Sequence, residues 1–168
     1  MQQQITTYPA HSASQCMTEK VPVVHEDTKL QEIEETLRQK GTDFETINYI
    51  YVVNREKKLV GVISLKEFFR YPKTERIGSV MRTSLKTVSA HTDQEHVVLM
   101  ALRHNLKAVP VVDKEKHFLG VVPSDIILDV LHREAIEDIL RYAGISTSRK
   151  NRLLLSEGSV KIHAWRRL

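Results

Sequence analysis

The segment Ile50-Tyr51-Val52-Val53-Asn54 recurs in the second half of the chain as Val109-Pro110-Val111-Val112-Asp113, and this repetition decides the fold. The apolar run that follows each copy is repeated at the same offset, at positions 59–63 and 118–122. A repeat at a fixed period is typical of a chain built from similar supersecondary units. The sequence therefore predicts two copies of a unit of about 60 residues.

The repeat extends upstream at a slightly larger offset. Val24 and Thr28 match Val88 and Thr92, and the offset between them exceeds that of the strands by five positions. The difference falls in loop 41–46, which is longer in the first copy. Surface loops tolerate insertions better than helices and strands do, so this difference supports the alignment.

Each unit is predicted to begin with a helix and to continue with two strands. The Thr-x-x-Glu/Gln patterns at 28–31 and 92–95 are typical of capping boxes, which begin helices. The apolar residues that follow share one helical face in each copy; they are Leu30, Ile33 and Leu37, then Val97, Val98, Ala101 and Leu102. Four β-rich runs come next, joined in pairs by polar loops of hairpin length; they are 49–53, 59–64, 108–112 and 118–122.

A second helix is predicted to complete each unit. Residues 65–71 form the first and end before Pro72, which cannot continue a helix, and residues 124–143 form the second and end at Gly144. The strand runs are nearly all apolar, so helices are expected to cover the sheets. The predicted fold class is α/β, an α+β sandwich of two α-β-β-α repeats.

The composition is that of an ordinary folded protein and excludes several other classes. The 168 residues are 41% hydrophobic and 27% charged, which is incompatible with a disordered or collagen-like chain. Cys16 is the single cysteine, so an internal disulfide and a cysteine metal site are excluded and a reducing compartment is expected. The N-terminus lacks a signal peptide, and no apolar run approaches the ~20 residues of a membrane span, so this chain itself is expected to be soluble.

No pattern in the sequence indicates catalysis, so the chain is predicted not to be an enzyme. A Gly-rich phosphate loop, a nucleophile elbow and a Ser-His-Asp order are all missing. His91, His96 and His104 lack the spacing of transition-metal ligands and are expected at the surface.

The positive net charge comes from the end of the chain. The whole sequence has a net charge of +4, which raises nucleic acid as a partner. Residues 1–143 carry 19 Lys and Arg against 20 Asp and Glu, whereas residues 144–168 carry six against Glu157 alone. The repeat region is therefore not basic, and no nucleic-acid partner is expected. A basic tail of this kind is typical of a cytoplasmic segment near a membrane.

The repeat resembles a tandem pair of CBS domains over about residues 21–133, and its flanks resemble MgtE-type magnesium transporters more specifically. The strings that carry this resemblance are Tyr8-Pro9-Ala10-His11-Ser12-Ala13 with Met17-Thr18, Thr92-Asp93-Gln94-Glu95, Asp129-Val130-Leu131 with 134–139, and Ala164-Trp165-Arg166-Arg167-Leu168. The resemblance implies two repeats related by pseudo-twofold symmetry. It also divides the chain into an N-terminal junction (1–20), CBS repeat 1 (21–76), CBS repeat 2 with a long connecting helix (77–143) and a basic tail (144–168).

The resemblance further implies a regulatory role. In the family, magnesium ions lie between acidic CBS surfaces, hold a cytosolic homodimer compact and favour the closed pore. The expected partners are a second copy, bound through the CBS domains, and a membrane transporter domain of the same full-length chain. The expected location is the cytoplasmic side of the inner membrane.

The candidate magnesium ligands are carboxylates of the second repeat. Magnesium prefers oxygen ligands and keeps several waters, so one or two carboxylates per site suffice. The candidates are Asp93, Asp113, Asp125, Asp129, Glu134 and Glu137, with Asp138 beside them. Glu134, Glu137 and Asp138 lie at helix-neighbour spacings, and such an acidic face either is solvated or binds metal. His132 and Arg133 stand where relatives commonly carry acidic residues, and a cation there would weaken a magnesium site.

The candidate nucleotide site lies in the first repeat. CBS domains usually place Ser or Thr three residues after a glycine, and Asp six residues after it, to hold phosphate and ribose. The first repeat offers Gly61, Ser64 and Glu67, whereas the second offers Gly120, Pro123 and Ile126, which have neither hydroxyl nor carboxylate. Ser64 also suits the N-cap of the helix that begins at residue 65. A CBS regulator that senses ATP or AMP, without a transport role, is therefore the alternative to a magnesium sensor.

Overall fold

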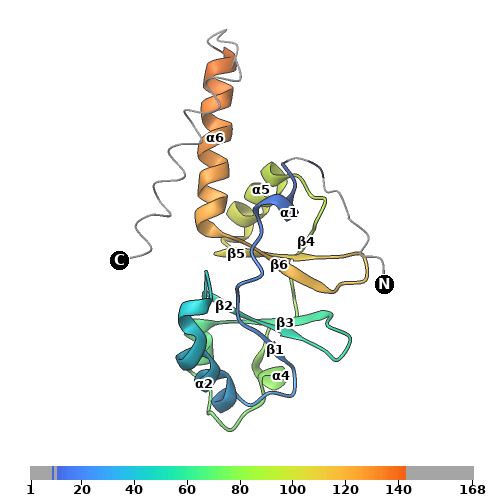
Figure 1. The fold of residues 1–168 in the computed structure, drawn as a ribbon, viewed down its shortest axis with the longest axis vertical. Helices are drawn as coiled ribbons and strands as arrows, with labels where there is room; N and C mark the ends of the chain where they lie inside the picture. Colours follow the sequence, from blue (N-terminus) through green and yellow to red (C-terminus); the bar gives the residue numbers. More distant parts are fainter. Residues whose placement is uncertain (1–8, 10, 143–168) are drawn as a thin grey trace.

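The computed structural model describes residue 9 and residues 11–142, and it shows two units built to the same plan (Figure 1). The elements of the first unit are β1 (Val23–His25), α2 (Leu30–Lys40), β2 (Tyr49–Val53), β3 (Leu59–Ser64) and α3 (Leu65–Phe68). Those of the second unit are β4 (Val88–Ser89), α5 (Gln94–His104), β5 (Ala108–Val112), β6 (Phe118–Pro123) and α6 (Ser124–Tyr142). Two further short helices precede the units in sequence, α1 (Ala13–Cys16) and α4 (Ile77–Val80).

Each unit contains a mixed three-stranded sheet. The strand orders are β1-β2-β3 and β4-β5-β6. In both sheets the first two strands are parallel and the last two form an antiparallel hairpin. The register shifts at the same place in both hairpins, between Val52 and Val53 and between Val111 and Val112. The predicted tandem CBS-like α/β architecture and its four main strands are confirmed.

The predicted order of elements omitted β1 and β4. These strands have three and two residues, which is too short for a recognisable alternation of polar and apolar side chains. Each is defined by its pairing with a strand that lies beyond the following helix in sequence, Val23 with Tyr51 and Val88 with Val111.

Each sheet packs its helices around a separate core. Leu30 and Ile33 of α2 are buried against β2 and β3 in the first unit, and Val97, Val98 and Ala101 of α5 are buried in the second. The prediction that Leu102 shares this buried face is wrong, because it lies at the edge of a narrow apolar stripe and is 56% exposed.

Two details at the helix ends differ from the predictions. The N-caps are Lys29 and Asp93, not the threonines of the predicted capping boxes. The Asp93 side chain accepts a hydrogen bond from the backbone N–H of Glu95 at 2.8 Å, whereas Thr92 Oγ1 accepts one from the N–H of Ser89. Helix α3 ends at Phe68, three residues earlier than predicted, because the next N–H groups bond carbonyls three residues back in tighter turns.

The two hairpins meet at the junction between the units. Lys58 and His117 form an antiparallel bridge, and Leu59 N–H donates to the Lys116 carbonyl at 2.9 Å while Phe118 N–H donates to that of Lys57 at 3.1 Å. A third apolar cluster fills this junction with side chains from both units; its buried members are Val21, Tyr51, Leu59, Ala108, Val112 and Val121.

Each unit is completed by a segment that precedes the other unit in sequence. The segment that contains α1 lies on the second unit, where Ala13 N–H donates to the Thr92 carbonyl at 2.7 Å and Thr18 pairs with Val121. The segment after α4 lies on the first unit, where Arg82 pairs with Val62. Figure 1 shows α1 beside α5 of the second unit, and the chain running from there to β1 of the first unit. We call residues 11–18 and 77–82 the straps.

The straps explain a glycine at the same place in each unit. A Cβ on Gly120 would lie 2.7 Å from the Thr18 carbonyl oxygen, and a Cβ on Gly61 would collide with the Met81 side chain. At Gly120 the strap backbone thus approaches the sheet more closely than a residue with a side chain would allow, whereas at Gly61 the contact is with the flexible Met81 side chain.

None of the helices in the described part of the chain is long and apolar enough to cross a membrane. The predicted basic tail, at 144–168, lies outside the described residues.

Candidate functional site

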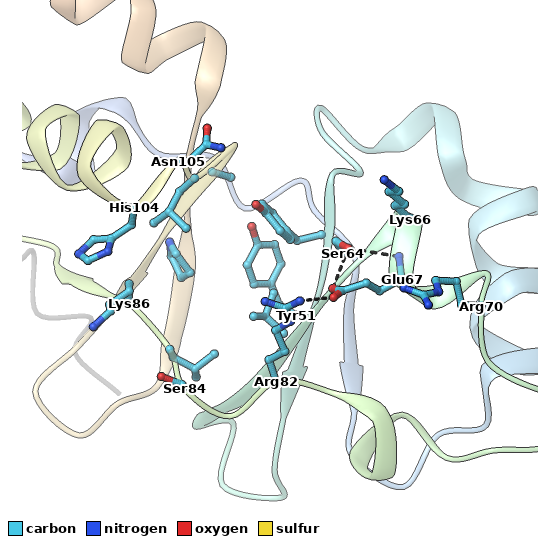
Figure 2. A pocket seen from close by; sticks show the side chains of 16 residues that line it. Tyr51, Ser64, Lys66, Glu67, Arg70, Arg82, Ser84, Lys86, His104 and Asn105 are labelled. Carbon is cyan, nitrogen blue, oxygen red and sulfur yellow. Dashed lines mark hydrogen bonds and ion pairs between the residues drawn. The ribbon is translucent and has the colours of Figure 1, made fainter.

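A pocket of about 450 Å³ lies between the two units, and we call it the inter-unit pocket. Its walls come from β2, β3 and α3 of the first unit, from α5 and β5 of the second, and from the segment 82–86 that joins them. Figure 2 shows Lys66, Glu67 and Arg70 on one side of it and Lys86, His104 and Asn105 on the other. Both predicted nucleotide-site residues, Ser64 and Glu67, line this pocket.

Ser64 and Glu67 form a closed hydrogen-bonding pair at the start of α3. The Ser64 hydroxyl caps the helix by accepting a bond from the Glu67 N–H at 3.2 Å, and it donates to Glu67 Oε2 at 2.8 Å. The other carboxylate oxygen, Oε1, accepts from Arg82 Nη2 of the strap, as the dashed lines in Figure 2 show. The bonds from Ser64 and Arg82 hold the pKa of Glu67 below its usual value. Ser64 is therefore a helix cap, as predicted, and also a wall of the pocket.

Two tyrosines form the apolar wall between these groups. The ring of Tyr51 stacks on Phe118 of the second unit with centroids 5.0 Å apart, and Tyr49 lies beside it. Tyr51 is 1% exposed and its hydroxyl has no hydrogen-bond partner among the described residues, and its burial raises its pKa strongly. The Tyr49 hydroxyl accepts a bond from the Lys107 N–H at 3.4 Å. Aromatic rings beside cationic side chains suit a ligand with both a flat apolar part and an anionic part.

Gly120, Pro123 and Ile126, the corresponding positions of the second repeat, are not among the residues that line the pocket. Pro123 is the last residue of β6, directly before α6. Ser64 and Glu67 of the first repeat thus line the pocket, whereas the matching positions of the second repeat do not.

A second group of functional interest lies between α5 and α6, and we call it the acidic cluster: Asp93, Glu95, Glu134 and Asp138. The Glu134 carboxylate beside Glu95, with smaller contributions from Asp93 and Asp138, raises the pKa of Glu95. Gln94, which is 7% exposed, donates from Nε2 to Glu134 Oε1 at 2.9 Å and so fixes one carboxylate of the cluster. The raised pKa of Glu95 indicates repulsion between like charges, which a divalent cation would relieve.

The structure brings two of the predicted ligands, Asp93 and Glu134, into this cluster. Glu137 lies half-buried on the same helix as Glu134. Asp125 and Asp129 lie nearer the start of α6, and Asp125 is about 13 Å from Glu134 along the helix axis. Asp129 Oδ2 lies 3.6 Å from Arg133 Nε. Arg133, the cation expected to weaken a magnesium site, therefore forms an ion pair with one of the candidate ligands.

Asp113 lies apart from the others, in the β5–β6 hairpin. Its Oδ1 accepts a bond from the His117 N–H at 2.8 Å, and its Oδ2 accepts one from His117 Nδ1 at 2.7 Å. Asn54 plays the same part in the first hairpin, where it accepts from the N–H groups of Glu56 and Lys58. Asp113, Glu115 and His117 place one potential ligand atom each within 4.8 Å of one another. Because Asn54 and Asp113 accept backbone hydrogen bonds at matching places in the two hairpins, the turn itself explains why Asp113 is present there.

Several residues at these sites were not singled out from the sequence. The sequence places Glu95 in a capping box and in one of the strings that carry the family resemblance, but does not indicate it as a metal ligand. Arg82 and the two tyrosines gave no local signal, because they reach the pocket through pairing between distant segments.

Comparison with known proteins agrees with this architecture. The CBS domain family matches residues 13–73 and 77–133. The magnesium transporter MgtE of Thermus thermophilus is 34% identical over 141 residues, which are 84% of this chain and 31% of that protein. This chain therefore spans about a third of the length of that relative.

Two solved structures resemble the chain closely. The crystal structure of the soluble part of a magnesium transporter has a TM-score of 0.74 and 32% identity, over 76% of this chain and 50% of that one. The cytosolic domain of the Mg²⁺ channel MgtE in complex with ATP has a TM-score of 0.71 and 34% identity, over 73% of this chain and 50% of that one. These relatives are transporters or parts of transporters rather than enzymes. The chain therefore belongs to the CBS domain family and is a tandem CBS pair similar to the cytosolic region of MgtE magnesium transporters.

Proposed function

We propose that this CBS pair senses magnesium and regulates transport by an MgtE-like membrane domain on the cytoplasmic side of the inner membrane. The acidic cluster is the observation that carries this proposal. Glu134 of α6 raises the pKa of Glu95 of α5, and Asp93 and Asp138 add smaller contributions of the same sign. Carboxylate oxygens are the ligands that magnesium prefers, and it commonly uses only one or two per site.

Regulation requires that magnesium favours one arrangement of the protein over another. Magnesium would bridge acidic groups within or between protomers and so favour a compact homodimer. The shift can be no larger than the difference in magnesium affinity between the two arrangements.

A homodimer is supported by four exposed leucines on two helices of the second unit. Leu99 and Leu102 of α5 and Leu128 of α6 are 56–61% exposed, and Leu131 is 39% exposed. The positions of α2 that match Leu99 and Leu102 in the repeat are Glu35 and Arg38, so the first unit has no such surface on this helix. Exposed apolar patches of this kind commonly mark protein interfaces.

Titration calorimetry with magnesium chloride tests the proposal at the acidic cluster. We expect Glu95→Gln and Glu134→Gln each to weaken magnesium binding about tenfold, since each removes one charge-bearing ligand. Glu32→Gln is the matched control, because Glu32 is an exposed glutamate of the equivalent helix α2. If the two variants bind magnesium as well as the control does, the acidic cluster is not the sensor.

A second candidate function, the binding of an adenine nucleotide, is favoured by the inter-unit pocket. The pocket has the volume of a small-molecule site, and it combines Ser64 and Glu67 with aromatic and cationic side chains. The related MgtE cytosolic domain was solved in complex with ATP. Calorimetry with ATP and AMP tests this function, and binding that is lost in Ser64→Ala would support it.

A further inference from the structure

The charges of the inter-unit pocket are unbalanced. Its lining contains four side chains that are cationic at neutral pH, Lys66, Arg70, Arg82 and Lys86, and Glu67 as the carboxylate. The cations stand on the first unit and on the joining segment, on opposite sides of the pocket, rather than forming one exposed helix face (Figure 2). A cleft lined mainly by one sign of charge concentrates ions of the opposite sign.

The carboxylate expected to hold ribose is already engaged. Both oxygens of Glu67 accept hydrogen bonds within the protein, one from Ser64 and the other from Arg82. Arg82 belongs to the strap that pairs with β3, so its backbone is fixed beside Glu67 by two hydrogen bonds with Val62. A ribose diol would have to compete with the guanidinium for the same carboxylate.

The same arginine is suited to phosphate. Its bond to Glu67 uses Nη2, whereas the guanidinium carries five N–H donors in a planar fork that matches phosphate oxygens. The Arg82 side chain is 72% exposed, so its other N–H donors can bind an anion while Nη2 stays on Glu67.

We propose that this pocket holds its ligand through phosphate rather than through ribose, and that its ligand class is polyphosphate anions. The inference rests on the second candidate function and specifies how that site selects its ligand. The class includes nucleoside triphosphates and inorganic polyphosphate, which share the chemistry that Arg82, Arg70 and the lysines recognise.

Calorimetry in magnesium-free buffer with ATP, inorganic tripolyphosphate and adenosine separates these contributions. We expect tripolyphosphate to bind within about tenfold of ATP, and adenosine to bind at least a hundredfold more weakly than ATP. Arg82→Gln should weaken tripolyphosphate about tenfold, the size of one lost charge-assisted hydrogen bond. Because it frees Glu67, the same substitution should leave adenosine binding equal or stronger.

Arg55→Gln is the control, because Arg55 is an exposed arginine of the β2–β3 loop outside the pocket lining. Equal effects of the two substitutions on tripolyphosphate would overturn the inference, as would adenosine that binds as tightly as ATP. If ATP and adenosine bind but tripolyphosphate does not, the inference about phosphate is refuted while the nucleotide function stands. Failure of all three ligands to bind would refute the nucleotide function as well.

Discussion

Two lysines adopt a backbone conformation that normally favours glycine. Lys57 and Lys116 have φ values of 60° and 72° and occupy matching positions in the two hairpins. A residue with a side chain is destabilised by roughly 1–2 kcal/mol in the left-handed region, and glycine avoids this cost. Glycine loses more conformational entropy on folding, so the net gain from a substitution to glycine is smaller. We expect Lys57→Gly and Lys116→Gly each to raise the free energy of unfolding by about 0.5–1 kcal/mol, measured by urea denaturation. Lys114→Gly, in the same loop but without a positive φ, should give no gain, and equal effects at all three positions would contradict this account.

Glu95 is expected to make stability depend on pH. Because neighbouring carboxylates raise its pKa in the folded state, its contribution to stability is present when it is protonated and is lost as pH rises through that pKa. In magnesium-free buffer, Glu95→Gln should therefore be more stable than the unsubstituted protein at pH 7, and this difference should shrink toward pH 4. Denaturation curves of both proteins at the two pH values measure it. A difference that is the same at both pH values would show that the carboxylates do not repel.

At the scale of elements, the cap of α5 can be separated from the charge of Asp93. Asp93→Ala should lower the free energy of unfolding by about 1 kcal/mol, since it removes the hydrogen bond to the Glu95 N–H. Asp93→Asn should retain that bond and most of the stability while removing the charge from the acidic cluster. Thermal or chemical denaturation of both variants checks this, and equal losses would show that Asp93 is not the cap.

The same helix shows how far the sequence determines local structure. A helix beginning near residue 93 was predicted correctly, but Thr92 and Asp93 are both good caps and local pattern does not choose between them. Thr92 does not cap the helix because its hydroxyl oxygen accepts a hydrogen bond from the Ser89 N–H in the preceding turn. The hairpins were predicted well, because in each of them the two strands and their polar loop follow one another directly in sequence.

The rest of the structure depends on contacts between distant segments. Tyr51 and Phe118 stack across the two units, and Arg82 reaches Glu67 only after its strap has paired with β3. For this reason Ser64, Glu67, Asp93 and Glu134 could be named as candidates from the sequence, whereas the pocket and the acidic cluster that gather them could not.

At the scale of the whole molecule, the straps make the two units depend on each other. Ala13 is fully buried in the core of the second unit, although it precedes the first unit in sequence. Ala13→Asp would bury an unpaired carboxylate, and we expect it to cost about 3 kcal/mol or more. Gln15→Asp, an exposed position of the same short helix, is the control and should change stability by less than about 0.5 kcal/mol. Similar losses in both variants, measured by chemical denaturation, would mean that α1 is not part of the core.

Small-angle scattering during a magnesium titration tests the proposed sensing function most directly. The account predicts that the particle becomes a more compact dimer as magnesium rises into the millimolar range, and that the response weakens in Glu134→Gln but persists in Glu32→Gln. A scattering profile that stays unchanged up to millimolar magnesium would contradict it.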